Sequence, residues 1–388
     1  MSAIQHGAGA FVALLGVATL VAILAERVRI PAAVALVAVG TLVPIEPPFA
    51  FGDTLLFVFL PPLIFEAAWN LDLAALRAGV WRIVLLAFPG TIVTAGLVGG
   101  GLTLVHALPA SAAFLFGAIV AATDPVAVVS AFRNVPVPAG LRTLVEGESL
   151  ANDGVALVLF GFALTAASGG QPSIALDALL GAGEVVGGVA IGCVLGFVCA
   201  GVLRATDASE YEATVTVVLA YVAYLTAAAA HCSGIFATAA GAIALRGAIA
   251  RLPGAITNAE DVDRVWSVFA FITNAVVFLA TGLLIRPERI AHEPALVLAA
   301  VIAVWLGRAL LAFVSVRRTA ERITVFLAGM RGALPLALAL SLPDSLPNRP
   351  QIIDATFAVV LVTVVVQGAP LAIVLRRLFP QETAAVPS

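Results

Sequence analysis

Long apolar runs separated by short polar stretches dominate the chain. An α-helix needs about 20 mostly apolar residues to cross the hydrocarbon core of a bilayer. Thirteen runs come near this length, with the second and ninth shorter than the others, and their expected ranges are 8–25, 31–45, 52–70, 82–105, 110–132, 142–167, 177–203, 211–230, 233–246, 263–285, 294–316, 322–341 and 353–375. The pattern predicts an all-α polytopic membrane protein with 13 transmembrane helices.

The arginines indicate how these helices are oriented. All 20 basic residues are Arg, and short cytoplasmic loops carry most of the positive charge of a membrane protein. Fifteen arginines follow odd-numbered spans, three follow even-numbered spans, and Arg308 and Arg331 fall inside spans. We therefore expect the N-terminus outside and the C-terminus in the cytoplasm. The first run has no basic residue before it and no cleavage site, so we expect a span rather than a signal peptide. Eleven residues follow Arg377, which predicts a short cytoplasmic tail.

The composition excludes several classes of protein. The chain is 62% hydrophobic and 11% charged, whereas a soluble domain is about 25% charged. No basic cluster with interleaved aromatic residues suggests a nucleic-acid partner, and no nucleotide-binding loop is present. The three cysteines lack zinc-ligand spacing. We expect no cofactor, and membrane lipid, monovalent cations and protons as partners.

Two corresponding spans carry helix breakers. An odd total permits six spans, a linker and six spans, so that spans 5 and 12 correspond at an offset of seven and the second copy is inverted. Span 5 contains Thr123-Asp124-Pro125, and span 12 contains Gly329, Gly332 and Pro335. Paired interrupted helices in two inverted halves mark the binding site of many transporters. Proline and glycine are also common in membrane helices generally, so a purely structural explanation stays open.

Carboxylates accompany the first break. Asp124 lies within span 5, and the segment EGESLAND, residues 146–153, begins the next span. An ionisable residue inside a membrane is costly and usually functional. Ser149 and Asp153 lie one helical turn apart and can face one cavity. Two carboxylates in consecutive spans predict a cation site, although pairing with donors in the core is an alternative.

Further oxygen atoms complete the predicted site. Sodium is a hard cation that prefers oxygen ligands, and Thr123 adds a hydroxyl beside Asp124. Pro125 has no N–H group, so we expect the carbonyl of Ala121, one turn earlier, to be free for coordination.

Five other polar residues lie in spans 3, 6, 11 and 12. We expect Asn152 to be structural rather than to bind the ion, by donating to the broken backbone of span 5. Glu66, near the cytoplasmic end of span 3, is either an interfacial acid or a contributor to the cavity. Arg331 needs a counter-ion, for which Glu148 is the best candidate, and Arg308 is expected to extend toward the membrane interface.

These residues together resemble a known family. The motifs are Phe65-Glu66-Ala67, Thr123-Asp124-Pro125, Glu148-Ser149-x-x-Asn152-Asp153 and Gly329-Met330-Arg331-Gly332. In this order they resemble the cation:proton antiporter family, and within it the NhaP- and NHE-type sodium/proton exchangers, over residues 8–378. The resemblance implies a secondary antiporter rather than an enzyme. It also implies the NhaA-like antiporter fold, with two inverted six-helix repeats and broken helices 5 and 12.

The resemblance also implies a domain plan and a place in the cell. Spans 1–4 occupy 1–105, of which spans 1–3 belong to a dimerisation domain and span 4 to a core domain. Residues 106–167 hold core spans 5 and 6, 168–210 the linker span 7, 211–290 dimerisation spans 8–10, and 291–388 core spans 11–13 with the tail. The implied protein is a homodimer of a bacterial inner membrane that serves pH homeostasis.

The implied site binds Na⁺ at Asp153, Asp124, Ser149, Thr123 and Glu66. Glu148 is implied to pair with Arg331 near the site. The electrogenic branch of the family has an Asp where Asn152 stands, paired with a lysine, and this chain has no lysine. It therefore resembles the electroneutral branch, with one proton exchanged per sodium. Li⁺ and K⁺ stay open as substrates.

Two other functions fit two intramembrane aspartates. An intramembrane aspartyl enzyme such as a protease would use them as an acid–base pair, and a cation channel would use them to attract ions. Cleavage of a substrate would identify the enzyme, and ionic current without coupling to pH would identify the channel.

Overall fold

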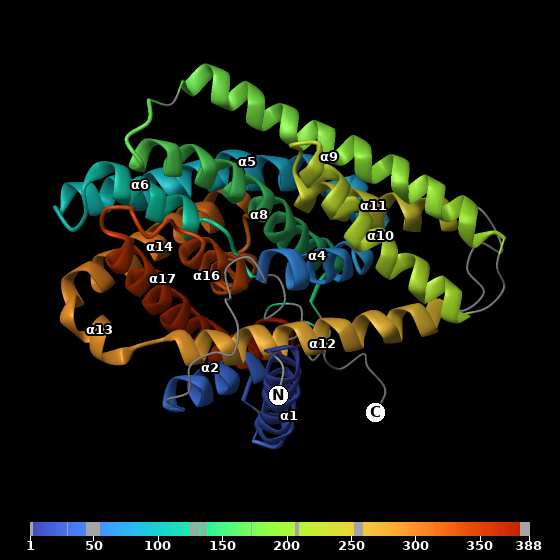
Figure 1. Cartoon of the computed structure of the whole chain (residues 1–388), viewed down its shortest axis with the longest axis horizontal. Coiled ribbons are helices and arrows are strands. Elements are labelled where there is room, and N and C mark those ends of the chain that lie inside the picture. Colours follow the sequence, from blue (N-terminus) through green and yellow to red (C-terminus); the bar gives the residue numbers. More distant parts are fainter. Residues whose placement is uncertain are drawn as a thin grey trace. The chain divides into compact units, whose positions relative to one another are not determined.

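The computed structural model describes residues 3–28, 30–43, 55–124, 128, 132, 135, 137–171, 173–205, 209–251 and 259–380. Within these ranges every regular element is helical (Figure 1). Seven of the described helices are long and apolar enough to cross a membrane, and shorter apolar helices of 10–17 residues accompany them. The prediction of an all-α polytopic membrane protein is confirmed.

The long helices follow the predicted apolar runs. They are α5 (Leu73–Leu104), α8 (Ala139–Ala167), α9 (Ile174–Leu203), α10 (Ser209–Ala229), α12 (Ala259–Leu284), α14 (Pro294–Ser315) and the continuous run from α17 (Arg349–Thr363) through η2 (Val364–Gly368) to α18 (Ala369–Leu378). The other helices are α1 (Ala3–Arg27), α2 (Ala32–Leu42), η1 (Leu55–Phe59), α4 (Leu60–Trp69), α6 (Ala110–Ile119), α11 (Gly234–Ile249), α13 (Pro287–His292), α15 (Thr319–Leu327) and α16 (Ala333–Leu340).

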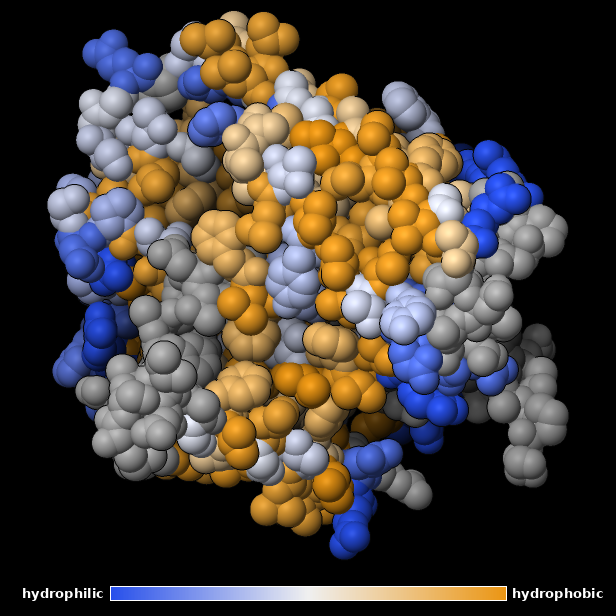
Figure 2. All heavy atoms as spheres, turned by 45° about the vertical axis from the view of Figure 1, so that its right-hand side comes forward, coloured by the Kyte–Doolittle hydropathy of each residue, from blue (hydrophilic) through white to orange (hydrophobic). Residues whose placement is uncertain are grey.

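Large apolar side chains cover much of the exposed surface. They form broad continuous areas in Figure 2, and on α9 Leu179 is 70% exposed and Val186 68%. Soluble monomers rarely expose apolar patches of this kind. Lipid is the solvent that accepts such a surface, while the helices satisfy their own backbone groups.

The chain divides into two compact units. The first comprises residues 1–55, 79–171 and 274–388, and the second comprises residues 56–78 and 172–273. In the second unit α9 packs closely on α11 through glycines. A Cβ atom at Gly192 would lie 2.0 Å from the carbonyl oxygen of Ala237, so only glycine permits this approach between the two helices.

The first unit contains two interrupted helices. Helix α6 ends at Ile119 and the chain is non-helical at 122–124, while α15 ends at Leu327 and α16 begins only at Ala333. The two extended segments meet, because the amide of Asp124 donates to the carbonyl of Met330 at 2.9 Å. Helices α6, α8, α16 and α17 pack around this meeting point (Figure 1).

The predicted breakers differ in their effects. Gly329 and Gly332 lie in the break of span 12, as expected. Pro335 does not break a helix, because α16 begins at Ala333 and Pro335 falls in its first turn, where a missing N–H group costs nothing. Pro125 lies outside the described residues.

Candidate ion-binding site

Helix α8 carries the polar residues of the motif Glu148-Ser149-x-x-Asn152-Asp153 on its buried face. Glu148, Ser149, Asn152 and Asp153 are each less than 7% exposed. The i and i+4 spacing that predicted a common face for Ser149 and Asp153 therefore holds in the helix. One carboxylate oxygen of Asp153, Oδ1, has no hydrogen-bond partner within the part of the chain that the structure describes. A buried acceptor without a partner is costly, and a bound cation or proton would satisfy it.

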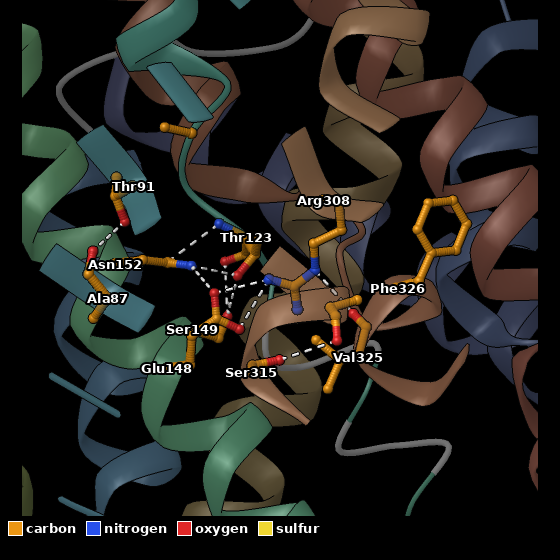
Figure 3. Close-up of polar contacts among 12 residues, drawn as sticks. Ala87, Thr91, Thr123, Glu148, Ser149, Asn152, Arg308, Ser315, Val325 and Phe326 are labelled. Carbon is orange, nitrogen blue, oxygen red and sulfur yellow. Dashed lines mark hydrogen bonds and ion pairs between the residues drawn. The ribbon is translucent and has the colours of Figure 1, made fainter. Parts of the chain in front are cut away.

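Thr123 connects α8 to the break after α6 (Figure 3). Its hydroxyl lies 2.8 Å from the hydroxyl of Ser149, and the Ser149 hydroxyl also donates to the Thr123 carbonyl at 3.1 Å. Asn152 donates from Nδ2 to the Thr123 hydroxyl at 2.8 Å and accepts from the Thr123 amide at 3.3 Å. Asn152 thus contacts the broken backbone by accepting from its N–H group, and not by donating to it as expected, while its amide group donates to the Thr123 side chain.

Asp124 lies directly against the second break. A Cβ atom at residue 332 would lie 2.0 Å from Oδ2 of Asp124, so Gly332 makes the space that the carboxylate occupies. Gly332 is also the residue before α16. The N-terminal end of a helix carries partial positive charge, which stabilises a carboxylate placed there.

Arg331 holds the end of the first interrupted helix. Its Nη1 donates to the carbonyls of Ala121 and Ala122 at 2.7 and 2.8 Å. The expectation of a free Ala121 carbonyl is therefore wrong. Both carbonyls lie just beyond the end of α6, where the described chain offers them no helical N–H group, and the guanidinium of the other broken span supplies the donor.

The expected pair between Glu148 and Arg331 is also wrong. Glu148 pairs instead with Arg308 of α14, whose Nη1 lies 2.8 and 2.9 Å from the two carboxylate oxygens (Figure 3). The Nε of Arg308 donates to the carbonyl of Val325 at 2.8 Å. Arg308 is 2% exposed, so it does not extend to the membrane interface. A guanidinium offers several donors in a fixed plane, and this one bridges α8 and the end of α15.

Glu66 lies in the second compact unit, on α4. It is 4% exposed, and its Oε1 accepts from Nδ2 of Asn70 at 2.8 Å. A buried carboxylate is unlike a solvated interfacial acid. A contribution of Glu66 to ion binding stays a prediction.

The buried groups in the first unit carry unequal charge. Glu146 has its own partner, Arg142, at 2.8 Å on the same helix. Among the described residues of this unit, the other buried charged side chains are three carboxylates and two guanidinium groups, whose formal charges add to −1 when all are ionised: Asp124, Glu148, Asp153, Arg308 and Arg331. One sodium ion or one proton would bring this cluster to zero.

Interrupted helices that meet beside buried carboxylates are the arrangement of a secondary transporter. A family described as "Sodium/hydrogen exchanger, transmembrane" matches residues 14–377. The chain belongs to this family, which is one of transporters and not of enzymes.

Several characterised proteins resemble the chain over most of its length. It is 31% identical over 387 residues to the Na(+)/H(+) antiporter NhaH of Halobacillus dabanensis, covering 94% of this chain and 96% of the relative. It is 35% identical over 379 residues to the Na(+)/H(+) antiporter ApNhaP of Aphanothece halophytica, covering 94% and 73%. The structure of the sodium proton antiporter MjNhaP1 from Methanocaldococcus jannaschii at pH 8 superposes with a TM-score of 0.77 at 21% identity, covering 97% of this chain and 99% of that one. The last likeness shows that the fold is shared.

Two residues of this region escaped the sequence analysis. Thr363 and Gln367 are fully buried and contact the second break, as described below. They are uncharged residues in the apolar run TVVVQG, so neither hydropathy nor charge distinguishes them.

Proposed function

We propose that this protein exchanges sodium for protons across a bacterial inner membrane. Asp153 and Asp124 carry the exchanged ion, and Thr123, Ser149 and Glu66 assist. The names of the relatives, which are Na(+)/H(+) antiporters, support the substrates. The formal charge of −1 carried by the described buried cluster of Asp124, Glu148, Asp153, Arg308 and Arg331 is the observation on which the mechanism rests.

A proton and a sodium ion compete for this cluster because either one cancels its negative charge. The unpartnered Oδ1 of Asp153 supplies an acceptor for both. Moving an uncompensated charge through lipid is costly, so the loaded site changes sides far more readily than the empty one. This difference couples the two fluxes without ATP.

The formal charge of −1 on the cluster also favours electroneutral exchange of one proton for one sodium. A second proton on the cluster would leave it with a net positive charge, which is again costly to bury. Asn152, next to Asp153, does not titrate. Glu148 is held by Arg308 in a two-oxygen contact, so it is a poor second proton carrier.

We further propose the architecture that the sequence predicts. Thirteen spans form two inverted six-helix repeats around the linker 168–210, with the N-terminus outside and the C-terminus in the cytoplasm. A dimerisation domain from 1–70 and 211–290 and a core domain from the remaining spans make up a homodimer. The short apolar helices beside the long ones support a larger number of spans than the seven long helices alone. The two compact units agree with the domain plan only in part, because residues 1–55 group with the proposed core residues 79–171, and most of the linker groups with residues 211–273.

Proton flux into proteoliposomes, followed with a pH-sensitive dye, tests the exchange. Addition of Na⁺, Li⁺ and K⁺ in turn gives the selectivity. The stoichiometry follows from the sodium gradient at which flux reverses, measured at zero potential and at a strongly negative interior set with valinomycin. An unchanged reversal point is expected, provided that K⁺ is not itself transported. A reversal point that moves with potential would mean net charge movement and would contradict one-for-one exchange.

A further inference from the structure

A short π-helical turn lies within the last long helical run of the first unit. Helix α17 passes at Thr363 into η2, Val364–Gly368, and then into α18. π-helical turns are rare and are frequently found at functional sites. Thr363 and Gln367 flank and occupy this turn, and both are 1% exposed or less.

These two side chains bind the backbone on both sides of the second break. Nε2 of Gln367 donates to the carbonyl of Phe326 at 2.9 Å, just before α15 ends. The Thr363 hydroxyl accepts from the amide of Arg331 at 3.1 Å, just before α16 begins. Backbone groups left open by a helix break inside a membrane must find such partners.

A third contact involves Gly368 at the end of the same turn. A Cβ atom at this position would lie 2.8 Å from Sδ of Met330, so glycine allows the buried Met330 to pack against η2. The turn and the residue before it therefore contact the segment 326–331 at its beginning, Phe326, and at its end, Met330 and Arg331.

The opposite side of that segment holds Asp124. The Met330 carbonyl accepts from the amide of Asp124, and the next glycine in the chain, Gly332, lies against its carboxylate. Arg331 donates to the carbonyls of residues 121 and 122. A change in how η2 holds residues 326–331 would thus displace Asp124.

We propose that Thr363 and Gln367 are positioning residues, which set the geometry of the ion site through segment 326–331 without touching the ion. This inference rests on the proposed role of Asp124 and Asp153. It assigns sodium affinity to a turn that carries no charge.

Isosteric substitution of Thr363 tests the role. Thr363→Val removes the hydroxyl and leaves the Arg331 amide without its acceptor, whereas Thr363→Ser keeps the hydroxyl. Thr356→Val is the matched control, because Thr356 is equally buried on α17 but its hydroxyl donates only to Ile352 within that helix. We expect Thr363→Val to raise the KM for Na⁺ in proteoliposomes about 5-fold, the factor for one lost hydrogen bond. Thr363→Ser and Thr356→Val should stay within about 2-fold of the wild type.

The KM separates positioning from simple stability. A residue that only supports folding would lower the melting temperature and the amount of protein without changing the KM. The proposal is overturned if Thr363→Val and Thr356→Val change the KM equally. Gln367→Met, which keeps its length but cannot donate to Phe326, carries the same expectation and replaces Thr363→Val if that variant does not accumulate.

Asp153→Asn, measured in parallel, separates this inference from the proposed site. Exchange that survives Asp153→Asn would refute the site itself. Exchange lost in Asp153→Asn, together with an unchanged KM in Thr363→Val, would refute only the positioning role.

Discussion

The pair between Glu148 and Arg308 allows a quantitative prediction of stability. Both side chains are buried, and Nη1 of Arg308 contacts both carboxylate oxygens. Glu148→Leu strands the guanidinium, and Arg308→Met strands the carboxylate with only Asn152 as a remaining donor at 3.1 Å. Removing one partner of a buried pair costs about 3–5 kcal/mol. Each single variant should lose that much free energy of unfolding.

The double variant should lose much less than the sum. Two apolar side chains of similar volume can replace a buried pair at little cost. The carbonyl of Val325 still loses its donor from Arg308, and an unsatisfied buried acceptor costs about 1–3 kcal/mol. The double variant should therefore be destabilised mainly by this amount, and the coupling between the two positions should be at least about 3 kcal/mol.

Unfolding by SDS in mixed micelles, followed by circular dichroism, provides the free energies for the double-mutant cycle. A parallel cycle with Glu148→Leu and Arg331→Met distinguishes the two arginines, because the guanidinium of Arg331 donates to backbone carbonyls. Its coupling should be about 1 kcal/mol or less. Additivity for Glu148 with Arg308, or a larger coupling with Arg331, would refute the assignment.

Two further predictions concern the ion site. Asp153→Asn and Asp124→Asn should each abolish sodium-driven proton flux while the protein still inserts, because neither amide carries a titrating proton or a full charge; near-normal flux in purified Asp153→Asn would contradict the mechanism. Gly332→Ala should reduce exchange severely, because its Cβ would overlap the Asp124 carboxylate. Gly161→Ala is the control and should leave flux and expression unchanged, because nothing lies within 4 Å of a Cβ atom at that position. Equal flux in the two variants would show that Asp124 does not need this space.

Much of the fold and part of the site could be predicted from local sequence. A span is a local property, because about 20 apolar residues suffice to cross the bilayer. The break at Thr123 and Asp124, and the common face of Ser149 and Asp153, likewise follow from the helix breakers and from helical spacing within a few residues. A contact of Asn152 with the broken backbone could also be expected, although its amide oxygen accepts from the Thr123 N–H group where a donation was predicted.

The partners of the buried charges depended on the tertiary structure. Arg308 and Arg331 each stand alone in an apolar run, and nothing within either run tells which one meets Glu148. Contacts between residues 160 positions apart depend on how separate helices pack, and helix–helix packing in lipid is decided by close fit rather than by hydropathy.

The hydrogen bonds of the backbone at the two breaks likewise depend partly on local sequence and partly on helix packing. Local sequence predicted that the Ala121 carbonyl lacks a helical partner, because Pro125 has no N–H group. The folded chain supplies the partners: a guanidinium for the Ala121 carbonyl, a glutamine amide for the Phe326 carbonyl and a threonine hydroxyl for the Arg331 amide. The physical reason is that a lost hydrogen bond is a local event, whereas its replacement inside a membrane can come from any helix that packs against the break.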